Sequence, residues 1–230
     1  MIRSIVSFVC LVLCVFAAAP LSAAEDAAPA LKRERIEWCD VWHTDADKTG
    51  KPRVLMIGDS ITRGYFSQAE EELGGKAHCS RYTTSRSICD PVFFQELSLV
   101  LGQYEYGVIH FNHGLHGWDY TEEQYAAAFD KLLAVLRAEG RGARLVWAST
   151  TPVQPSSDMG KDRDRVAARN AIAAEKTARE GIPVNNLHAL SADHPEHFSK
   201  DGVHFAPEGI ALQAHAVAAA ITKALDSPQK

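Results

Sequence analysis

Cysteine is scarce in this chain: it has 5 cysteines among 230 residues, and two of them, Cys10 and Cys14, lie in an apolar run near the N-terminus. The other three, Cys39, Cys79 and Cys89, are too few and too scattered for a zinc module. They allow one disulfide in an oxidising compartment and leave one thiol over, and the spacing does not fix which two would pair. The sequence therefore predicts neither a zinc module nor a defined disulfide.

Basic clusters and long apolar runs are also missing. The chain carries 24 Lys and Arg against 29 Asp and Glu, a net charge of −5, and it has no basic stripe. A nucleic-acid partner is therefore not expected, because phosphate binding needs clustered cations. No apolar run reaches the ~20 residues that a membrane-spanning helix needs.

The first 24 residues have the three parts of a secretory signal peptide. Residues 1–3 give a charged start, residues 5–19 an apolar run, and residues 22–24 a small-residue cleavage site. The alternative is an uncleaved N-terminal anchor, but the Ala-rich exit favours cleavage. We expect a secreted or periplasmic protein without stable membrane insertion after cleavage. Loss of Arg3 would leave 23 basic against 29 acidic residues, a net charge of −6.

The remainder has the size and pattern of one domain. Residues 25–37 are Ala-rich and then charged, and we interpret them as a flexible lead-in. Residues 38–228 show no repeat and no second boundary, and they suffice for a single domain with a full core. The stretch from 151 to 161, rich in Pro, Ser and Asp, is the longest loop and a candidate lid.

Strand-like and helix-like segments alternate along this domain. Continuous apolar runs at 54–57, 108–111 and 145–148 are typical of strands buried on both faces, and weaker strands are predicted at 182–184 and near 81–83. Helices are predicted from the capping signals Asp90–Pro91, Thr121-x-x-Gln124 and Pro207, and over 163–180. The alternation predicts an α/β fold with a parallel sheet covered on both faces.

Three polar clusters follow predicted strands or precede the last helix. They are Gly58-Asp59-Ser60, the segment 112–116, and Asp201-Gly-Val-His204. Ligands gather at the carboxyl ends of strands in an open parallel sheet, so these clusters are the candidate site. A serine at the start of a helix lies near free backbone N–H groups that can stabilise an oxyanion. The alternative is that Ser60 merely caps the helix, a role that Asp59 could equally take.

Asp201 and His204 supply what a nucleophilic serine needs. At a spacing of three in a helical turn, both side chains point the same way. The carboxylate can bind one imidazole nitrogen and leave the other to accept the proton of Ser60, although a surface turn is the plainer alternative for this pair alone. No Gly-x-Ser-x-Gly elbow is present, which argues against the α/β-hydrolase fold.

These blocks resemble those of the SGNH hydrolases, the GDSL esterase/lipase superfamily. Gly58-Asp59-Ser60-Ile61 is similar to the family's first block, and Asp201-x-x-His204 is similar to its last. Asn-x-Gly-Leu-His at 112–116 and Thr-Thr-Pro at 150–152 resemble a bacterial extracytoplasmic branch. The resemblance implies a three-layer α/β/α sandwich with a small parallel sheet, similar to flavodoxin, and catalysis by Ser60, His204 and Asp201 without a cofactor.

The oxyanion donors depart from the family pattern. The third block is usually Gly-x-Asn-Asp, and aligning Gly114 with its glycine puts His116 where the donating asparagine would be. Asn112 is the alternative donor. The second-block glycine has no match between 84 and 90, and Ser87 is the candidate there. One lost donor costs ~10²–10³ in rate, so these substitutions matter.

The resulting hypothesis is a serine esterase that hydrolyses small acyl esters through an acyl-enzyme, including acetyl groups on carbohydrate. The substrate would be a small-molecule or glycan ester. One alternative is a non-catalytic glycan-binding protein on the same fold. Another is a nucleotide-binding α/β domain, which is disfavoured because no phosphate-cradling Gly-rich loop follows the first strand.

Three histidines at 110, 113 and 116 have a spacing that suggests a metal site. We do not expect one, because strand geometry sends alternate side chains to opposite faces and no carboxylate pattern lies nearby.

Overall fold

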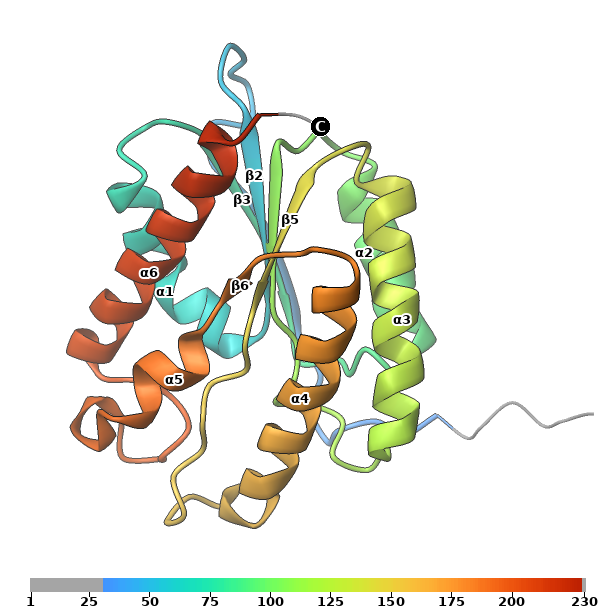
Figure 1. The fold of residues 1–230 in the computed structure, drawn as a ribbon, viewed down its shortest axis with the longest axis vertical. Coiled ribbons are helices and arrows are strands. Elements are labelled where there is room, and N and C mark those ends of the chain that lie inside the picture. Colours follow the sequence, from blue (N-terminus) through green and yellow to red (C-terminus); the bar gives the residue numbers. More distant parts are fainter. Residues whose placement is uncertain (1–30, 229–230) are drawn as a thin grey trace, which may run out of the picture. The chain divides into compact units, whose positions relative to one another are not determined.

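The computed structural model describes residues 31–228, so the predicted signal peptide and the first part of the lead-in lie outside the described residues. A six-stranded sheet stands between two layers of helices (Figure 1). Its strands are β1 (Cys39–His43), β2 (Arg53–Gly58), β3 (His78–Thr84), β4 (Val108–Phe111), β5 (Arg144–Ala148) and β6 (Val184–Asn185). This arrangement confirms the predicted α/β/α sandwich.

The order of the strands determines where a ligand can bind. The sheet runs β1-β3-β2-β4-β5-β6, with β1 antiparallel at one edge and the other five strands parallel. The chain moves from β2 to β3 on one side and later to β4 on the other. In open α/β sheets ligands bind at such a reversal, outside the carboxyl ends of the two strands. Here that place lies after β2 and β4.

The helices cover the two faces separately. The helices α1 (Ser60–Glu72), α5 (Leu187–Ala192) and α6 (Pro207–Asp226) lie on one face. The other face carries α2 (Pro91–Leu101), α3 (Glu122–Glu139) and α4 (Arg163–Arg179). Short 3-10 turns occur at Gly160–Asp162 and Pro195–His197.

Strand β2 divides the core between these layers. Val54 and Met56 pack in the cluster that α1 and α6 complete, whereas Leu55 and Ile57 pack against α2 and α3. All four side chains are buried, and each contributes about 1.5–3 kcal/mol by leaving water. The continuous apolar run in the sequence therefore forms the centre of the fold, and the turn that follows it is attached to a strand buried on both faces.

Most predicted element boundaries agree with the structure. Asp90 caps α2 by accepting from the Val92 N–H, and Thr121 with Gln124 forms the predicted capping box of α3. The strand predicted at 182–184 is displaced to β6, because the Ile182 N–H bonds to the end of α4 instead of to a neighbouring strand. The edge strand β1 and the short α5 had no expected counterpart. None of the helices within 31–228 has both the length and the apolarity needed to cross a lipid bilayer.

Candidate active site

Ser60 lies in a tight turn between β2 and α1. The preceding residue, Asp59, is the N-cap of α1, and its Oδ1 accepts a hydrogen bond from the Ile61 N–H at 2.9 Å. Capping therefore falls to Asp59 and leaves the Ser60 hydroxyl free, which settles the alternative raised by the sequence. A Cβ on Gly58 would lie 2.1 Å from Oγ1 of Thr62, so only glycine allows this approach. As the first helical residue, Ser60 also has a backbone N–H without an intrahelical partner.

The fold brings His204 to this hydroxyl across 144 positions of sequence. The distance between His204 Nε2 and Ser60 Oγ is 2.8 Å, and Nδ1 lies 2.6 Å from Oδ2 of Asp201. A hydroxyl, an imidazole and a carboxylate thus form one continuous hydrogen-bonded chain. The juxtaposition expected from the motifs is present.

Asp201 is held as a carboxylate by its neighbours. Its Oδ1 accepts from the Ser199 hydroxyl at 2.8 Å and from the N–H groups of Val203 and His204 at 2.9 Å each. Partial burial raises the pKa of Asp201, but the bonds from the His204 ring and from these donors outweigh it and hold the pKa well below its usual range. An anionic Asp201 accepts a hydrogen from Nδ1, so Nε2 of His204 presents its lone pair to Ser60.

The loop at 151–161 supports the turn that carries these residues. The Gln154 N–H donates to the Gly202 carbonyl at 2.8 Å. Gly202 has φ +69°, and a Cβ there would lie 2.9 Å from that of Gln154. This loop was a candidate lid, yet in the structure it packs beneath the Asp201–His204 turn. The side chains of Asp201 and His204 are 51% and 47% exposed, so the site opens directly to solvent.

Asn112 does not have a free amide to offer an oxyanion. Its Nδ2 donates to the Ala148 carbonyl at 2.6 Å, and Oγ1 of Thr150 lies at 3.5 Å from the same nitrogen. Both amide hydrogens therefore face the end of β5. The expectation that Asn112 could serve as oxyanion donor is corrected on this ground: its amide joins β4 to β5.

A buried arginine binds the backbone of the loop after β4. Arg169 of α4 is 1% exposed and donates to the carbonyls of Gly114 at 3.1 Å, His116 at 2.8 Å and Gly117 at 2.9 Å. Its guanidinium also lies 4.2 Å from the ring centre of Trp118. This role could not be predicted from the sequence, because an arginine in a helix of mixed polarity normally faces water. Only the packing of α4 against this loop reveals it.

Gly114 and Ser87 contribute close packing of the two loops. A Cβ on Gly114 would lie 2.1 Å from Oγ1 of Thr150, so the loop passes tightly over the end of β5. Ser87, in the loop between β3 and α2, accepts from the Cys89 N–H at 3.1 Å through its hydroxyl. That hydroxyl also lies 2.2 Å from where a Cβ on Gly117 would be. The hydroxyl oxygen of Ser87 therefore accepts a bond within its own loop and packs closely against the loop after β4.

His116 forms an ion pair with a residue that the motifs did not single out. Its Nδ1 lies 3.0 and 3.1 Å from the two carboxylate oxygens of Glu34. Burial alone would lower the pKa of His116, but the bond to Glu34 and the charges of Asp59 and Glu34 raise it above its ordinary value. Burial would raise the pKa of Glu34, yet the His116 contact holds it below the usual range. The two pKa values are thus shifted in opposite directions, and both shifts favour the ion pair.

The other two histidines of the 110–116 segment are separated by the sheet. The ring of His110 packs edge-on to Tyr65 of α1, and that of His113 packs on Phe93 of α2. Burial lowers the pKa of His110 to about 4 and that of His113 to about 3, so both are neutral. His110 lies in β4 and His113 in the loop that follows it, and their rings pack against helices on opposite faces of the sheet.

One group of side chains in residues 31–228 has metal-ligand spacing. The ligand atoms of His194, Glu196 and His197 lie within 4.8 Å of one another on the turn that precedes Asp201. The cysteines Cys39, Cys79 and Cys89 are free thiols and add no ligand to this group.

Comparison with known proteins finds similar folds among solved structures. Neither a protein-family model nor a curated protein matches the sequence. Among solved structures, the lipase/acylhydrolase from Enterococcus faecalis is 14% identical with a TM-score of 0.63, covering 78% of this chain and 100% of the other. A GDSL-like lipase from Bacteroides thetaiotaomicron is 16% identical, with a TM-score of 0.59 over 79% and 94% of the two chains.

A third similar structure is the C-terminal catalytic domain of peptidoglycan O-acetyltransferase A from Streptococcus pneumoniae. It is 20% identical with a TM-score of 0.58, and the match covers 78% of this chain and 98% of that domain. At these identities the likeness establishes the fold. The chain has the fold of the SGNH/GDSL hydrolases, which confirms the fold that the sequence resemblance implied.

Proposed function

We propose that this protein is a serine esterase that cleaves small acyl esters through an acyl-enzyme. The observation that carries the proposal is the chain of short contacts from Ser60 to His204 to Asp201, at 2.8 and 2.6 Å. A serine hydroxyl becomes nucleophilic only when a base within hydrogen-bond reach takes its proton. His204 has the required lone pair because Asp201 occupies its other nitrogen.

The reaction proceeds in two displacements. Ser60 Oγ bonds to the ester carbonyl carbon while its proton passes to Nε2 of His204, and the carbonyl oxygen becomes an oxyanion. Collapse of this intermediate breaks the bond to the alcohol, which leaves with the proton from His204. Water then attacks the acyl-enzyme and gives a proton to His204, and the second collapse releases the acid while Ser60 regains its proton.

Three donors are proposed for the oxyanion. The Ser60 N–H is free at the start of α1, where the helix dipole also favours negative charge. The Ser87 N–H comes from the loop after β3. His116 supplies the third from Nε2, because its Nδ1 is bound to Glu34. Each such donor is worth ~10²–10³ in kcat, because the charge develops in the transition state.

The exposure of the site favours an acyl group carried on a large polar alcohol. Asp201 and His204 are about half exposed, so an extended molecule can reach the base without entering a deep cavity. We therefore propose acetyl esters of carbohydrate as the substrate class. The similarity to a domain that handles peptidoglycan O-acetyl groups supports this choice.

The test is hydrolysis of p-nitrophenyl acetate by the purified protein and its Ser60→Ala variant. Ser67 lies exposed on the same helix, so Ser67→Ala is the matched control. We expect turnover in the wild type and in Ser67→Ala, and none above background in Ser60→Ala with an unchanged circular dichroism spectrum. Acetate release from acetylated polysaccharides then identifies the substrate. Glycan binding without turnover in the wild type would refute the esterase and support the non-catalytic alternative.

A further inference from the structure

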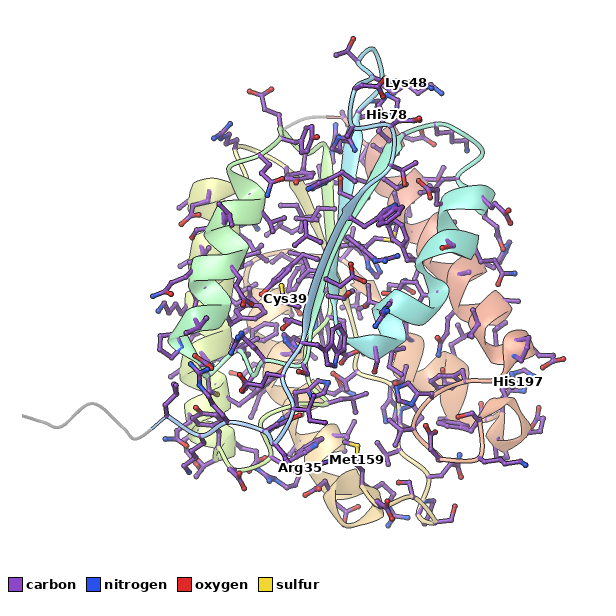
Figure 2. All side chains as sticks on the ribbon, turned by 180° about the vertical axis from the view of Figure 1, so that it is seen from behind. Arg35, Cys39, Lys48, His78, Met159 and His197 are labelled. Atoms are coloured by element: carbon purple, nitrogen blue, oxygen red, sulfur yellow. The ribbon has the colours of Figure 1, made fainter. Side chains whose placement is uncertain are left out.

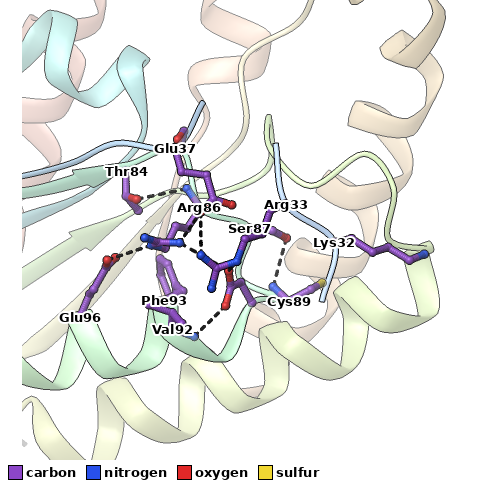
Figure 3. Close-up of polar contacts among 12 residues, drawn as sticks. Lys32, Arg33, Glu37, Thr84, Arg86, Ser87, Cys89, Val92, Phe93 and Glu96 are labelled. Atoms are coloured by element: carbon purple, nitrogen blue, oxygen red, sulfur yellow. Dashed lines mark hydrogen bonds and ion pairs between the residues drawn. The ribbon is translucent and has the colours of Figure 1, made fainter. Parts of the chain in front are cut away.

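The segment at 31–38, called here the N-terminal strap, is bound to the loop that follows β3. The Trp38 N–H donates to the Ser85 hydroxyl at 3.0 Å, and the Ser85 N–H donates to the Trp38 carbonyl at 3.1 Å. Glu37 of the strap forms an ion pair with Arg86, which also binds Glu96 of α2 at 2.9 Å (Figure 3). The strap is therefore attached to the loop that contains Ser87.

The same strap is bound to the loop that follows β4. The Lys32 N–H donates to the Tyr120 hydroxyl at 3.0 Å, and its ammonium group donates to the Asp119 carbonyl. Arg35 of the strap lies at the same end of the molecule as Met159, which precedes α4, and His197, in the turn that precedes Asp201 (Figure 2). The strap thus connects the two loops that are proposed to hold the oxyanion.

Glu34 is the strap residue that reaches furthest into this arrangement. Besides its two contacts with His116 Nδ1, its Oε1 accepts from the Gly117 N–H at 3.2 Å. His116 is only 18% exposed at its side chain. The other charges facing it are Asp59, beside the nucleophile, and Arg169, which holds its carbonyl. His113, the remaining titratable neighbour, is neutral.

The contact at Nδ1 determines what Nε2 can do. A carboxylate accepts only, so Nδ1 must carry a hydrogen when it binds Glu34. In neutral imidazole the other nitrogen is then a bare lone pair, which repels an oxyanion. Only the protonated ring can bind Glu34 and donate from Nε2 at the same time. A neutral amide at position 34 would leave the ring mostly neutral, and the donor would be lost as pH rises.

We propose that Glu34 is a positioning residue of the active site, which holds His116 as an imidazolium so that its Nε2–H binds the acyl oxygen in the transition state. The inference rests on the proposed esterase. It assigns a function to a residue well outside the four sequence blocks. It also makes the reaction depend on two histidines in opposite states, with His204 unprotonated and His116 protonated. The rate should therefore fall at high pH as well as at low pH.

The test compares pH profiles of kcat for the wild type, Glu34→Gln and the control Lys32→Met. Lys32→Met removes a strap contact to the same loop and leaves the His116 pair intact. On the alkaline side of the profile (its alkaline limb), kcat falls as His116 loses its proton. In Glu34→Gln we expect this fall to occur about 1–3 pH units lower than in the wild type, the shift that a neighbouring opposite charge produces. At pH 8 its kcat should fall ~10-fold or more, since a lost donor costs ~10²–10³, with KM little changed. Glu34→Asp should restore part of the rate, and Lys32→Met should keep the wild-type limb.

A His116→Asn variant separates positioning from structural support. Its amide donates without titrating, so the alkaline limb should disappear, and Glu34→Gln should then have little further effect on kcat in this background. If Glu34 only anchors the strap, its replacement will cost the same factor with and without His116 and at every pH.

The titration of the His116 ring, followed by NMR, gives a readout that needs no turnover. A lower midpoint in Glu34→Gln than in the wild type supports the inference. An equal midpoint overturns it, as does an unchanged alkaline limb in a wild type that Ser60→Ala inactivates. If the wild type hydrolyses no ester while the His116 midpoint still shifts, the esterase proposal is what fails.

Discussion

Replacing Asp201 by asparagine tests the catalytic chain most directly, because the structure fixes how the new amide must lie. Oδ1 of Asp201 faces two backbone N–H groups and the Ser199 hydroxyl, so this site can hold only an acceptor. The amide oxygen must occupy it, and the NH₂ group then takes the place of Oδ2, 2.6 Å from Nδ1 of His204. A donor there forces Nδ1 to accept. The hydrogen moves to Nε2, where it faces Ser60 and blocks proton transfer.

The expected loss follows from this tautomer change. A serine nucleophile facing a protonated Nε2 has no base, and the corresponding change in serine proteases lowers kcat by ~10⁴. Asp201 and His204 are half exposed here, so water can partly replace the lost orientation, and we expect the lower part of the range ~10³–10⁴. A tenfold change is about 1.4 kcal/mol, so the barrier should rise by about 4–5 kcal/mol. KM should change little, because Asp201 does not touch the substrate.

The assay is steady-state hydrolysis of p-nitrophenyl acetate at pH 8, with circular dichroism as a check on folding. Ser199→Ala provides the graded control: it removes one of three donors to Oδ1 and leaves the carboxylate, so its rate should fall tenfold or less. An Asp201→Asn variant that is folded and loses less than tenfold in kcat would refute the reasoning, since the tautomer of His204 would then not depend on Asp201.

Three further predictions follow from the packing and the charges. Gly114→Ala should lower the unfolding free energy by about 1–3 kcal/mol, because its Cβ would overlap Thr150, and Thr150→Ala should relieve part of that loss in urea unfolding. Arg169→Met leaves three buried carbonyls without their donor and should cost about 3–5 kcal/mol, seen as a lower Tm together with lost turnover. The lowered pKa of Asp201 means that its carboxylate stabilises the fold above about pH 4 and loses this effect as pH falls toward that pKa, so the stability difference from Asp201→Asn should shrink between about pH 5 and pH 2.

Local signals were enough to predict the framework of the fold. The apolar run at 54–57 predicted a strand buried on both faces, and β2 is the centre of the sheet. The caps at Asp90 and Thr121 predicted helix starts correctly, because capping depends on a few neighbouring residues. The blocks around Ser60 and His204 likewise indicated which polar residues to bring together. Each of these inferences uses chemistry confined to a short stretch of chain.

Tertiary structure decided everything that depends on a partner distant in sequence. The 2.8 Å contact between Ser60 and His204 forms because α1, which begins at Ser60, packs beside α6, which follows His204, on the same face of the sheet. The sequence could not show that the Asn112 amide donates to the Ala148 carbonyl at the end of β5, or that Arg169 is buried against the loop after β4. Glu34 gave no signal at all, since a charged residue in a polar lead-in acquires a role only when the strap meets His116. Hydrogen-bond partners and burial are properties of the folded chain, and the physical chemistry of the site depends on both.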